Sequence, residues 1–525
     1  MSPLWYDFFY FPKVQFGWYH GFDRPSIGGA VFSFSSLASL KESIYFFMRK
    51  ILQEVEIMNI AFLIVCLYIV LLFAISYYAK RRSAGSATNY VLAGRKLTTP
   101  LITVSIVGLA VGGASTIGVA EQAYKVGLSA GWYTTAWGIG AIVMGLLVAK
   151  KYRELNITTI PELLGRYYDK KGMIAGIACQ IIVQLVVMSL QYIAGGSILC
   201  ALMPEVFTLT TGMLTSAAVF IGITSIGGMW SASLSNLLNV SLKYIGIILA
   251  TIVGVSQIGG LNKLQLQLPQ NVPYMDFFDG VGITGIITWI VVLVTVNLSL
   301  QSIIQISLGA KDVRTAQRGF IIGGLMMLPI GFVSALMGVM AKAMFPDVSP
   351  ALALPKAIMS LDPILAGITL AALWAADVST ACNLLLSSAT LFSQDIYKKF
   401  VNPNVSEQNF LRITKGAVVL LGLLTLTLAM TISGIISTLM IGLSLMAAFS
   451  VIVLFTLFAP RFCRKNSAFN TIITGVVVLV LWQTVPAVRI LPHVIYLEWL
   501  ACLGTFFLTY ALDRESIAVV EEECA

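Results

Sequence analysis

Charged residues are scarce in this sequence. Asp, Glu, Lys and Arg make up 11% of the 525 residues, hydrophobic residues make up 58%, and the mean hydropathy is +0.88. Because a soluble domain is about 25% charged and 45–50% apolar, the composition excludes an ordinary soluble protein. It is typical of a chain that crosses a lipid bilayer many times. The net charge of +9 matters only through its placement, and we expect no nucleic-acid partner.

Histidine and paired cysteine are also scarce. The chain has two histidines and seven cysteines, and the cysteines show no C-x-x-C spacing. This pattern excludes a disulfide scaffold and a metal cage, and it disfavours catalysis by histidine. The sequence contains no H-E-x-x-H motif. We therefore expect no enzymatic activity, no organic cofactor and no structural or catalytic metal.

Long apolar runs dominate what is present. A helix needs about 20 residues to cross the roughly 30 Å of bilayer hydrocarbon, and runs of that length recur along the whole chain. They predict thirteen spans, near residues 59–79, 101–120, 129–149, 173–201, 208–226, 234–257, 283–306, 320–343, 364–392, 414–431, 433–459, 467–486 and 491–511.

Lys and Arg are distributed unevenly between the two sets of loops. In membrane proteins they concentrate in cytoplasmic loops. Here 22 of them follow odd-numbered spans and five follow even-numbered spans. The bias predicts a multi-pass protein of the cell membrane with its N-terminus outside and its C-terminus in the cytoplasm.

The two ends of the chain differ from the spans. Residues 1–57 are aromatic-rich and irregular, without the apolar core of a signal peptide. Met58 begins "MNIAFLIVCLYIV", a natural start for the first span, so we interpret residues 1–57 as a start-site artefact in preference to a functional amphipathic leader. Residues 58–515 form the membrane domain, and residues 516–525 form a short cytoplasmic tail.

Polar and glycine residues interrupt the second and seventh spans, which are five spans apart. The second carries Gly108, Gly112 and Gly113, and the seventh carries Asn297 and Gln301. Irregular backbone at membrane depth survives only where it lines a cavity, although small and polar residues also pack helices closely. The spacing predicts two inverted five-span units, 101–257 and 283–459, each opening with a discontinuous helix, as in many secondary transporters.

Several segments in order resemble the sodium:solute symporters. The resemblance covers residues 58 to about 460 and implies an all-α, LeuT-type fold of two inverted five-helix repeats with about 13 transmembrane helices. It implies secondary active transport, with sodium and a small organic solute carried together by alternating access. The matching segments are "YVLAGRKL" (90–97), "EQAYKVG" (121–127), "ITTIPELLGRYY" (157–168), "GGMW" (227–230), "LQSIIQISLGAKD" (300–312) and "AADVSTACNLLLSSATLFSQDIY" (375–397).

The resemblance places a sodium site between the second and ninth spans. Sodium is a hard cation that takes oxygen ligands, and an unwound helix frees carbonyl groups that a regular helix keeps for itself. The ninth span adds two hydroxyl groups on one side of a helix, and the alternative is that these hydroxyls bond back to their own helix. The implied ligands are the carbonyls of Gly108, Val111 and Ala376 and the hydroxyls of Ser379 and Thr380.

The resemblance also places the solute between the breaks of the second and seventh spans. Free amide groups there suit an anionic group of a solute. The expected pocket is small and mostly uncharged, which favours an amino acid or a carboxylic acid over a sugar. The expected contacts are Gly112, Gly113, Ser115, Asn297 and Gln301, with Gln184 and Gln191 on the fourth span as weaker ones.

Three positions near the expected ion site depart from the family. Asn236 stands where relatives often have a carboxylate, Asp377 precedes the Ser-Thr pair, and Lys243 lies in the middle of the sixth span. A lysine at a helix centre costs about 2.5–3.5 kcal/mol on insertion scales and needs a partner. Two interpretations stay open. Lys243 and Asp377 form a structural ion pair, or Lys243 supplies the positive charge in place of sodium, which makes the carrier proton-coupled or ion-independent.

Other classes of membrane protein fit less well. A channel is disfavoured because the repeat is asymmetric and lacks a ring of charged pore residues. A transporter-like sensor stays open as an alternative of another class, acting with a separate signalling partner. Secondary transport, coupled to sodium, is the function that the sequence favours.

Overall fold

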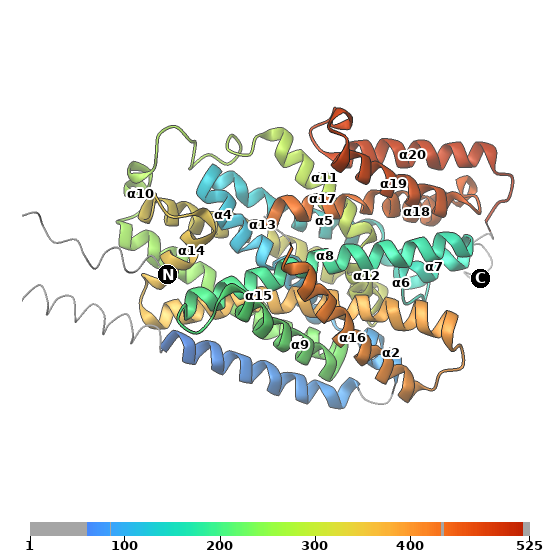
Figure 1. Ribbon diagram of the computed structural model, residues 1–525, viewed down its shortest axis with the longest axis horizontal. Helices are drawn as coiled ribbons and strands as arrows, with labels where there is room; N and C mark the ends of the chain where they lie inside the picture. Colours follow the sequence, from blue (N-terminus) through green and yellow to red (C-terminus); the bar gives the residue numbers. More distant parts are fainter. Residues whose placement is uncertain (1–59, 84–85, 432–434, 518–525) are drawn as a thin grey trace, which may run out of the picture. The chain divides into compact units, whose positions relative to one another are not determined.

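The computed structural model describes residues 60–83, 86–431 and 435–517, which form helices joined by loops (Figure 1). Within those ranges, pairing of the β type is limited to two isolated bridges, Leu97 with Ala310 and Arg464 with Ser516. The all-α prediction is therefore confirmed for this part of the chain. The interpretation of residues 1–57 lies outside the described residues, as does most of the expected tail.

Ten helices among the described residues are long and apolar enough to cross a membrane. A single membrane-spanning segment can satisfy all its backbone polar groups in lipid only as a helix. The helices are Ile60–Ser83, α5 (Trp132–Leu147), α8 (Lys170–Leu202), α9 (Leu209–Ile258), α13 (Val313–Met344), α15 (Pro363–Thr390), α16 (Glu407–Ala429), α17 (Ile435–Ser444) with α18 (Met446–Phe458), α19 (Ser467–Thr484) and α20 (Val494–Leu512).

Two further spans are bent pairs of helices. The pair α3 (Thr99–Ala110) and α4 (Ile117–Val126) bends by 74°, and the pair α11 (Ile283–Ser299) and α12 (Gln301–Leu308) bends by 51°. These are the second and seventh spans of the sequence prediction, so both expected interruptions are present. They bring the possible number of spans to 12.

Helix α9 accounts for the difference between twelve spans and the expected thirteen. Its 50 residues would extend about 75 Å at 1.5 Å per residue, far more than the hydrocarbon thickness. Gly228 interrupts it with φ 53° and ψ −134°, a conformation that is open to glycine because it has no Cβ. The kink falls between the predicted fifth and sixth spans, so α9 contains both.

Helix α15 lies among other helices and has little lipid-facing surface. It packs against α9, α8, α3 and α16, and α8, α9 and α15 run alongside one another in Figure 1. By contrast, the last two spans, α19 and α20, pair with each other and are drawn in dark red (Figure 1). A polar side chain on α15 therefore meets protein, not lipid.

The loops rich in Lys and Arg are joined to one another by hydrogen bonds. Arg95 donates to the carbonyl of Ile157 (3.0 Å), and Arg153 donates to the carbonyl of Ala310 (2.9 Å). The backbone of Lys465 donates to the carbonyl of Glu515 (3.0 Å). These contacts bring loops that follow odd-numbered spans together, at one end of the helices.

The loops of the other end are joined in the same way. The Tyr124 hydroxyl donates to the carbonyl of Phe345 (2.7 Å), and the Trp132 indole donates to the carbonyl of Phe277 (2.8 Å). Short helices cover the two ends: α2 (Ala87–Leu92), α6 (Ala149–Glu154) and α7 (Ile160–Tyr167) at the basic end, and α10 (Leu261–Gln267) and α14 (Pro350–Met359) at the other.

Candidate functional site

The break between α3 and α4 requires glycine. Gly112 and Gly113 pass so close to α15 that a Cβ on Gly112 would collide with the Thr380 hydroxyl, and one on Gly113 with the Asp377 carboxylate. Val111 leaves the helical conformation with φ −92° and ψ 66°. The last carbonyls of α3 therefore have no intrahelical donor and face α15.

Side chains of α15 reach those carbonyls. The Ser379 hydroxyl lies 2.7 Å from the Gly108 carbonyl oxygen and 2.8 Å from that of Ala376. The Thr380 hydroxyl lies 2.9 Å from the Leu109 carbonyl oxygen, 3.1 Å from that of Gly108 and 3.3 Å from that of Ala376. Four of the five expected sodium ligands, on two helices far apart in the sequence, are thus within contact of one another.

Lys243 of α9 lies beside the fifth expected ligand, the carbonyl of Val111. Its ammonium Nζ donates to the carbonyl oxygen of Val111 at 2.6 Å and to the Ser379 hydroxyl at 3.2 Å. The side chain is 0% exposed. An ammonium group, which carries the same charge as sodium, is therefore bound by two members of the expected ligand set.

Asp377 does not pair with this ammonium. Its side chain is 0% exposed, and neither carboxylate oxygen has a hydrogen-bond partner among the described residues. The ion pair between Lys243 and Asp377 considered from the sequence is therefore not formed in this conformation. Asn236 is also buried; it packs on Gly108, and its Oδ1 accepts a long hydrogen bond of 3.5 Å from Asn239.

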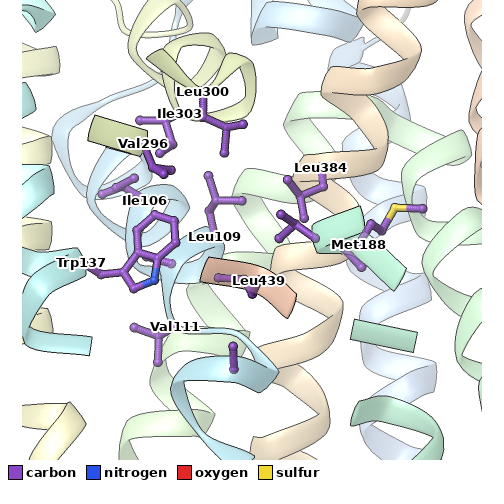
Figure 2. Close-up of a cluster of buried hydrophobic side chains, with 14 of the residues drawn as sticks. Ile106, Leu109, Val111, Trp137, Met188, Val296, Leu300, Ile303, Leu384 and Leu439 are labelled. Carbon is purple, nitrogen blue, oxygen red and sulfur yellow. The ribbon is translucent and has the colours of Figure 1, made fainter. Parts of the chain in front are cut away.

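A small cavity adjoins the break. Its volume is about 20 Å³, room for about one water molecule, so an organic solute enters only if the surrounding helices move apart. Figure 2 shows its apolar side chains gathered around Leu109, with Trp137, Leu300, Leu384 and Leu439 about it. The polar lining comes from Gly112, Gln191 and Thr380, with the hydroxyl of Tyr133 and the indole of Trp137.

Of the residues expected to contact solute, Gly112 and Gln191 line the cavity, whereas Gly113 and Ser115 lie beside it. The Gly113 amide donates to Gln191 Oε1 at 3.0 Å, so this amide is already satisfied. The Ser115 hydroxyl donates to the Ala110 carbonyl at 2.7 Å and closes the break.

The other three expected solute contacts lie away from the cavity. Asn297 donates to the Leu293 carbonyl of its own helix at 2.8 Å and packs on Gly140. Gln301 Oε1 accepts from the Ile160 amide at 2.8 Å. Gln184 Oε1 accepts from the Ser387 hydroxyl. In this conformation each of the three side chains is hydrogen-bonded to another segment or to the backbone of its own helix.

Sequence reasoning missed most of the cavity wall. Tyr133 and Trp137 of α5 and Leu439 and Leu443 of α17 line it. An aromatic or leucine residue inside a hydrophobic span has no distinguishing signal, because such residues serve equally for helix packing and for contact with lipid. Only the arrangement of helices reveals which of them face the break.

Metal binding by acidic, histidine or cysteine side chains is not indicated. Among the described residues, no group of three or more His, Cys, Asp or Glu side chains could hold a metal ion. The groups that converge at the break are carbonyl and hydroxyl oxygens instead.

Comparison with known proteins gives a consistent result over most of the chain. Residues 90–475 match the model of the sodium:solute symporter family. A sodium/proline symporter of Salmonella typhimurium is 25% identical over 452 residues, which are 80% of this chain and 86% of that protein. A sodium/glucose cotransporter of Vibrio parahaemolyticus is 23% identical over 418 residues, which are 71% of this chain and 75% of that protein.

Solved structures show the same architecture. A Na⁺-coupled sialic acid symporter in a substrate-bound outward-open state superposes with a TM-score of 0.73 at 15% identity, covering 87% of this chain and 98% of that chain. MhsT in complex with L-phenylalanine superposes with a TM-score of 0.52 at 14% identity, covering 78% of this chain and 98% of that chain. These likenesses concern the fold alone, and they confirm the LeuT-type fold class expected from the sequence.

Proposed function

Since the chain belongs to the sodium:solute symporter family, we propose that it carries a small organic solute across the membrane together with sodium, by alternating access around the broken helices. The observation that carries the proposal is the meeting of α3 and α15. Carbonyl groups freed at a helix break face two hydroxyls of a buried helix, with Ser379 2.7 Å and Thr380 3.1 Å from the Gly108 carbonyl oxygen.

Five oxygen atoms form the proposed ion site. Each hydroxyl now donates its hydrogen to a carbonyl, and a bound cation would replace those hydrogen bonds by accepting lone pairs from all five oxygens. Discontinuous helices build ion sites near the midplane in many secondary transporters in this way. The proposed ligands are the carbonyls of Gly108, Val111 and Ala376 and the hydroxyls of Ser379 and Thr380.

The solute is proposed to bind in the cavity between α3, α5, α8, α15 and α17. An amino acid or a carboxylic acid fits better than a sugar, because the wall is mostly apolar and its polar groups are few. If the two repeats are residues 101–257 and 283–459, as we propose, one broken helix starts each unit. Motion of one unit against the other would widen the cavity toward alternate sides.

We further propose that the basic end of the helices faces the cytoplasm. The loops that contain Arg95, Arg153 and Lys465 are hydrogen-bonded into that end, and basic loops stay on the cytoplasmic side. The N-terminus would then lie outside and the C-terminus inside the cell membrane.

A second candidate function follows from Lys243. Its ammonium lies 2.6 Å from the Val111 carbonyl oxygen and 3.2 Å from the Ser379 hydroxyl, so the protein already has a cation where sodium is proposed to bind. If the ammonium stays there through the cycle, the protein is a carrier of the same solute that needs no sodium at this site.

Thermal unfolding of the full chain in detergent tests the ion site without a known solute. The unfolding temperature is measured against sodium, with potassium and choline at matched ionic strength, because an ion that binds only the folded state stabilises it as its concentration rises. A rise specific to sodium that is lost in Thr380→Ala supports sodium symport.

Thr369→Ala is the matched control for that variant. Thr369 is buried on the same helix, but its hydroxyl donates only to the Leu365 carbonyl of that helix at 2.7 Å. It should keep the sodium response. No response to sodium in the wild-type protein rejects sodium binding at this site and favours the second candidate.

A further inference from the structure

Asp377 is a buried carboxylate that belongs to neither the proposed sodium site nor the cavity lining. Both of its oxygens lack a hydrogen-bond partner among the described residues, and its side chain is 0% exposed. A buried charge without compensating hydrogen bonds is costly. The one buried ammonium nearby, that of Lys243, donates to Val111 and Ser379 instead. Apart from the Gly113 backbone that lies against it, the carboxylate therefore has lone pairs free to accept hydrogen bonds.

Its position is next to the solute cavity. Residues three and four apart lie on one face of a helix, and Asp377, Thr380 and Leu384 form such a stripe on α15. The last two of these line the cavity. One Asp377 oxygen also abuts Gly113, which stands between the cavity-lining residues Gly112 and Ala114. The carboxylate therefore lies next to the cavity, about one helical turn before the lining residue Thr380.

The surroundings of the carboxylate favour a donor with a positive charge. The cavity is lined mostly by apolar side chains, and its polar groups are those of Gln191 and Thr380 with the Tyr133 hydroxyl and the Trp137 indole. The Thr380 hydroxyl already donates to the Leu109 carbonyl at 2.9 Å, and Gln191 Nε2 to the Val187 carbonyl at 3.3 Å. Both donors are thus engaged with backbone carbonyls, which leaves the carboxylate able to accept a donor from the ligand.

A protonated amine provides what the site lacks. It carries three N–H donors, and its hydrogen bonds to a carboxylate are charge-assisted and about twice as strong as neutral ones. Sugar hydroxyls also donate, but they do not neutralise the buried charge, and the apolar wall offers them few partners.

We propose that Asp377 binds the protonated amine of the transported solute, so that amino acids or amines are carried in preference to amine-free carboxylic acids. This inference rests on the proposed function, because it takes the cavity to be the solute site. It narrows the two solute classes left open above to the one that contains an amine.

The test compares each amino acid with the same molecule lacking its amine. The full chain in detergent is screened by thermal unfolding with the twenty standard amino acids, with amine-free partners such as propionate for alanine and isovalerate for valine, and with amines such as isobutylamine. At least one amine-bearing compound should raise the unfolding temperature, and its amine-free partner should bind at least about tenfold more weakly, as expected on losing a charge-assisted hydrogen bond.

Variants of Asp377 connect that preference to the carboxylate. Asp377→Asn keeps the shape and should abolish the preference for the amine, whereas Asp377→Glu keeps the charge and should retain it in part. Asp395→Asn is the matched control: Asp395 is also buried on this helical run, but it is paired with Lys399 at 2.8 Å, and its loss should leave the amine preference unchanged.

Three results would overturn the proposal. They are equal binding of an amino acid and its amine-free partner, an amine preference that survives in Asp377→Asn, and no stabilisation by any amine-bearing compound. Binding is measured here without an ion gradient, so the inference stands or falls separately from sodium symport. Sodium-driven uptake of an amine-free acid would sustain the proposed function and reject this inference alone.

Discussion

The ammonium of Lys243 lies 2.6 Å from the carbonyl oxygen of Val111. These residues belong to α9 and to the end of α3, and 132 positions separate them in the chain. A charged hydrogen bond of this length, in a place without solvent, holds the unwound end of α3 against α9. The same ammonium also fills part of the space in which a sodium ion would meet Val111 and Ser379.

The first prediction concerns competition between this ammonium and sodium. Lys243→Met removes the charge but keeps an unbranched side chain. Two monovalent cations cannot share these oxygens, so the variant should bind sodium at least about tenfold more tightly than the wild type. Sodium at about 100 times its dissociation constant then adds about 2.7 kcal/mol to the free energy of unfolding, measured by thermal unfolding in sodium against choline.

Lys263→Met serves as the control for that variant. Lys263 is exposed on α10, so its replacement should leave the sodium response as in the wild type. Equal sodium responses in Lys243→Met and the wild type would show that the ammonium does not compete for the site.

The second prediction concerns the glycine break. A Cβ at Gly113 would overlap the Asp377 carboxylate and come within 2.7 Å of Ala194 Cβ. Gly113→Ala should therefore push α4 away from α15 and α8. Solute uptake into proteoliposomes should fall at least about tenfold, and overpacking of this kind typically costs 1–3 kcal/mol of stability.

Gly416→Ala is the comparison for Gly113→Ala. No atom lies within 4 Å of the position of its Cβ, and alanine favours a helix over glycine by about 1 kcal/mol. It should match or exceed the wild type in stability and leave uptake unchanged. Uptake that survives Gly113→Ala would mean that the close approach of α4 to Asp377 is not needed for transport.

The sequence predicted those parts of the site whose residue types are unusual in a membrane span. Gly112 and Gly113, beside polar residues in a hydrophobic span, predicted a break, and the break is present. The resemblance to the sodium:solute symporters implied that the hydroxyls of Ser379 and Thr380 meet the carbonyls of α3. The Gly108 carbonyl accepts from both.

The sequence could not decide between partners that are equally plausible chemically. Lys243 needed an acceptor, and Asp377 was as good a choice as the Val111 carbonyl until the positions of α3, α9 and α15 were known. The same limit applies to Trp137, whose role in the cavity wall depends on which way α5 faces. Polarity identifies residues that need a partner, but three-dimensional arrangement selects the partner.

The third prediction separates a structural role from solute contact at Gln301. From the sequence this residue was expected to contact solute, but its Oε1 accepts from the Ile160 amide at 2.8 Å and its Nε2 donates to the Thr158 carbonyl at 3.2 Å. Gln301 thus attaches the start of α12 to the start of α7. Gln301→Ala would leave the Ile160 amide unpaired, and we expect a loss of about 2–3 kcal/mol in the free energy of unfolding.

Gln301→Ala should change the solute selectivity far less than it changes the stability of the fold. In Gln301→Ala, the order in which competing solutes inhibit uptake should match the wild type, because the side chain lies away from the cavity lining. Gln265→Ala, on the exposed face of α10, controls for the loss of a glutamine as such and should change neither stability nor uptake. A changed order of solute preference with unchanged stability would contradict this expectation. It would mean that Gln301 contacts the solute in another state of the transport cycle, because loss of a solute contact alters selectivity without breaking the hydrogen bonds between α12 and α7.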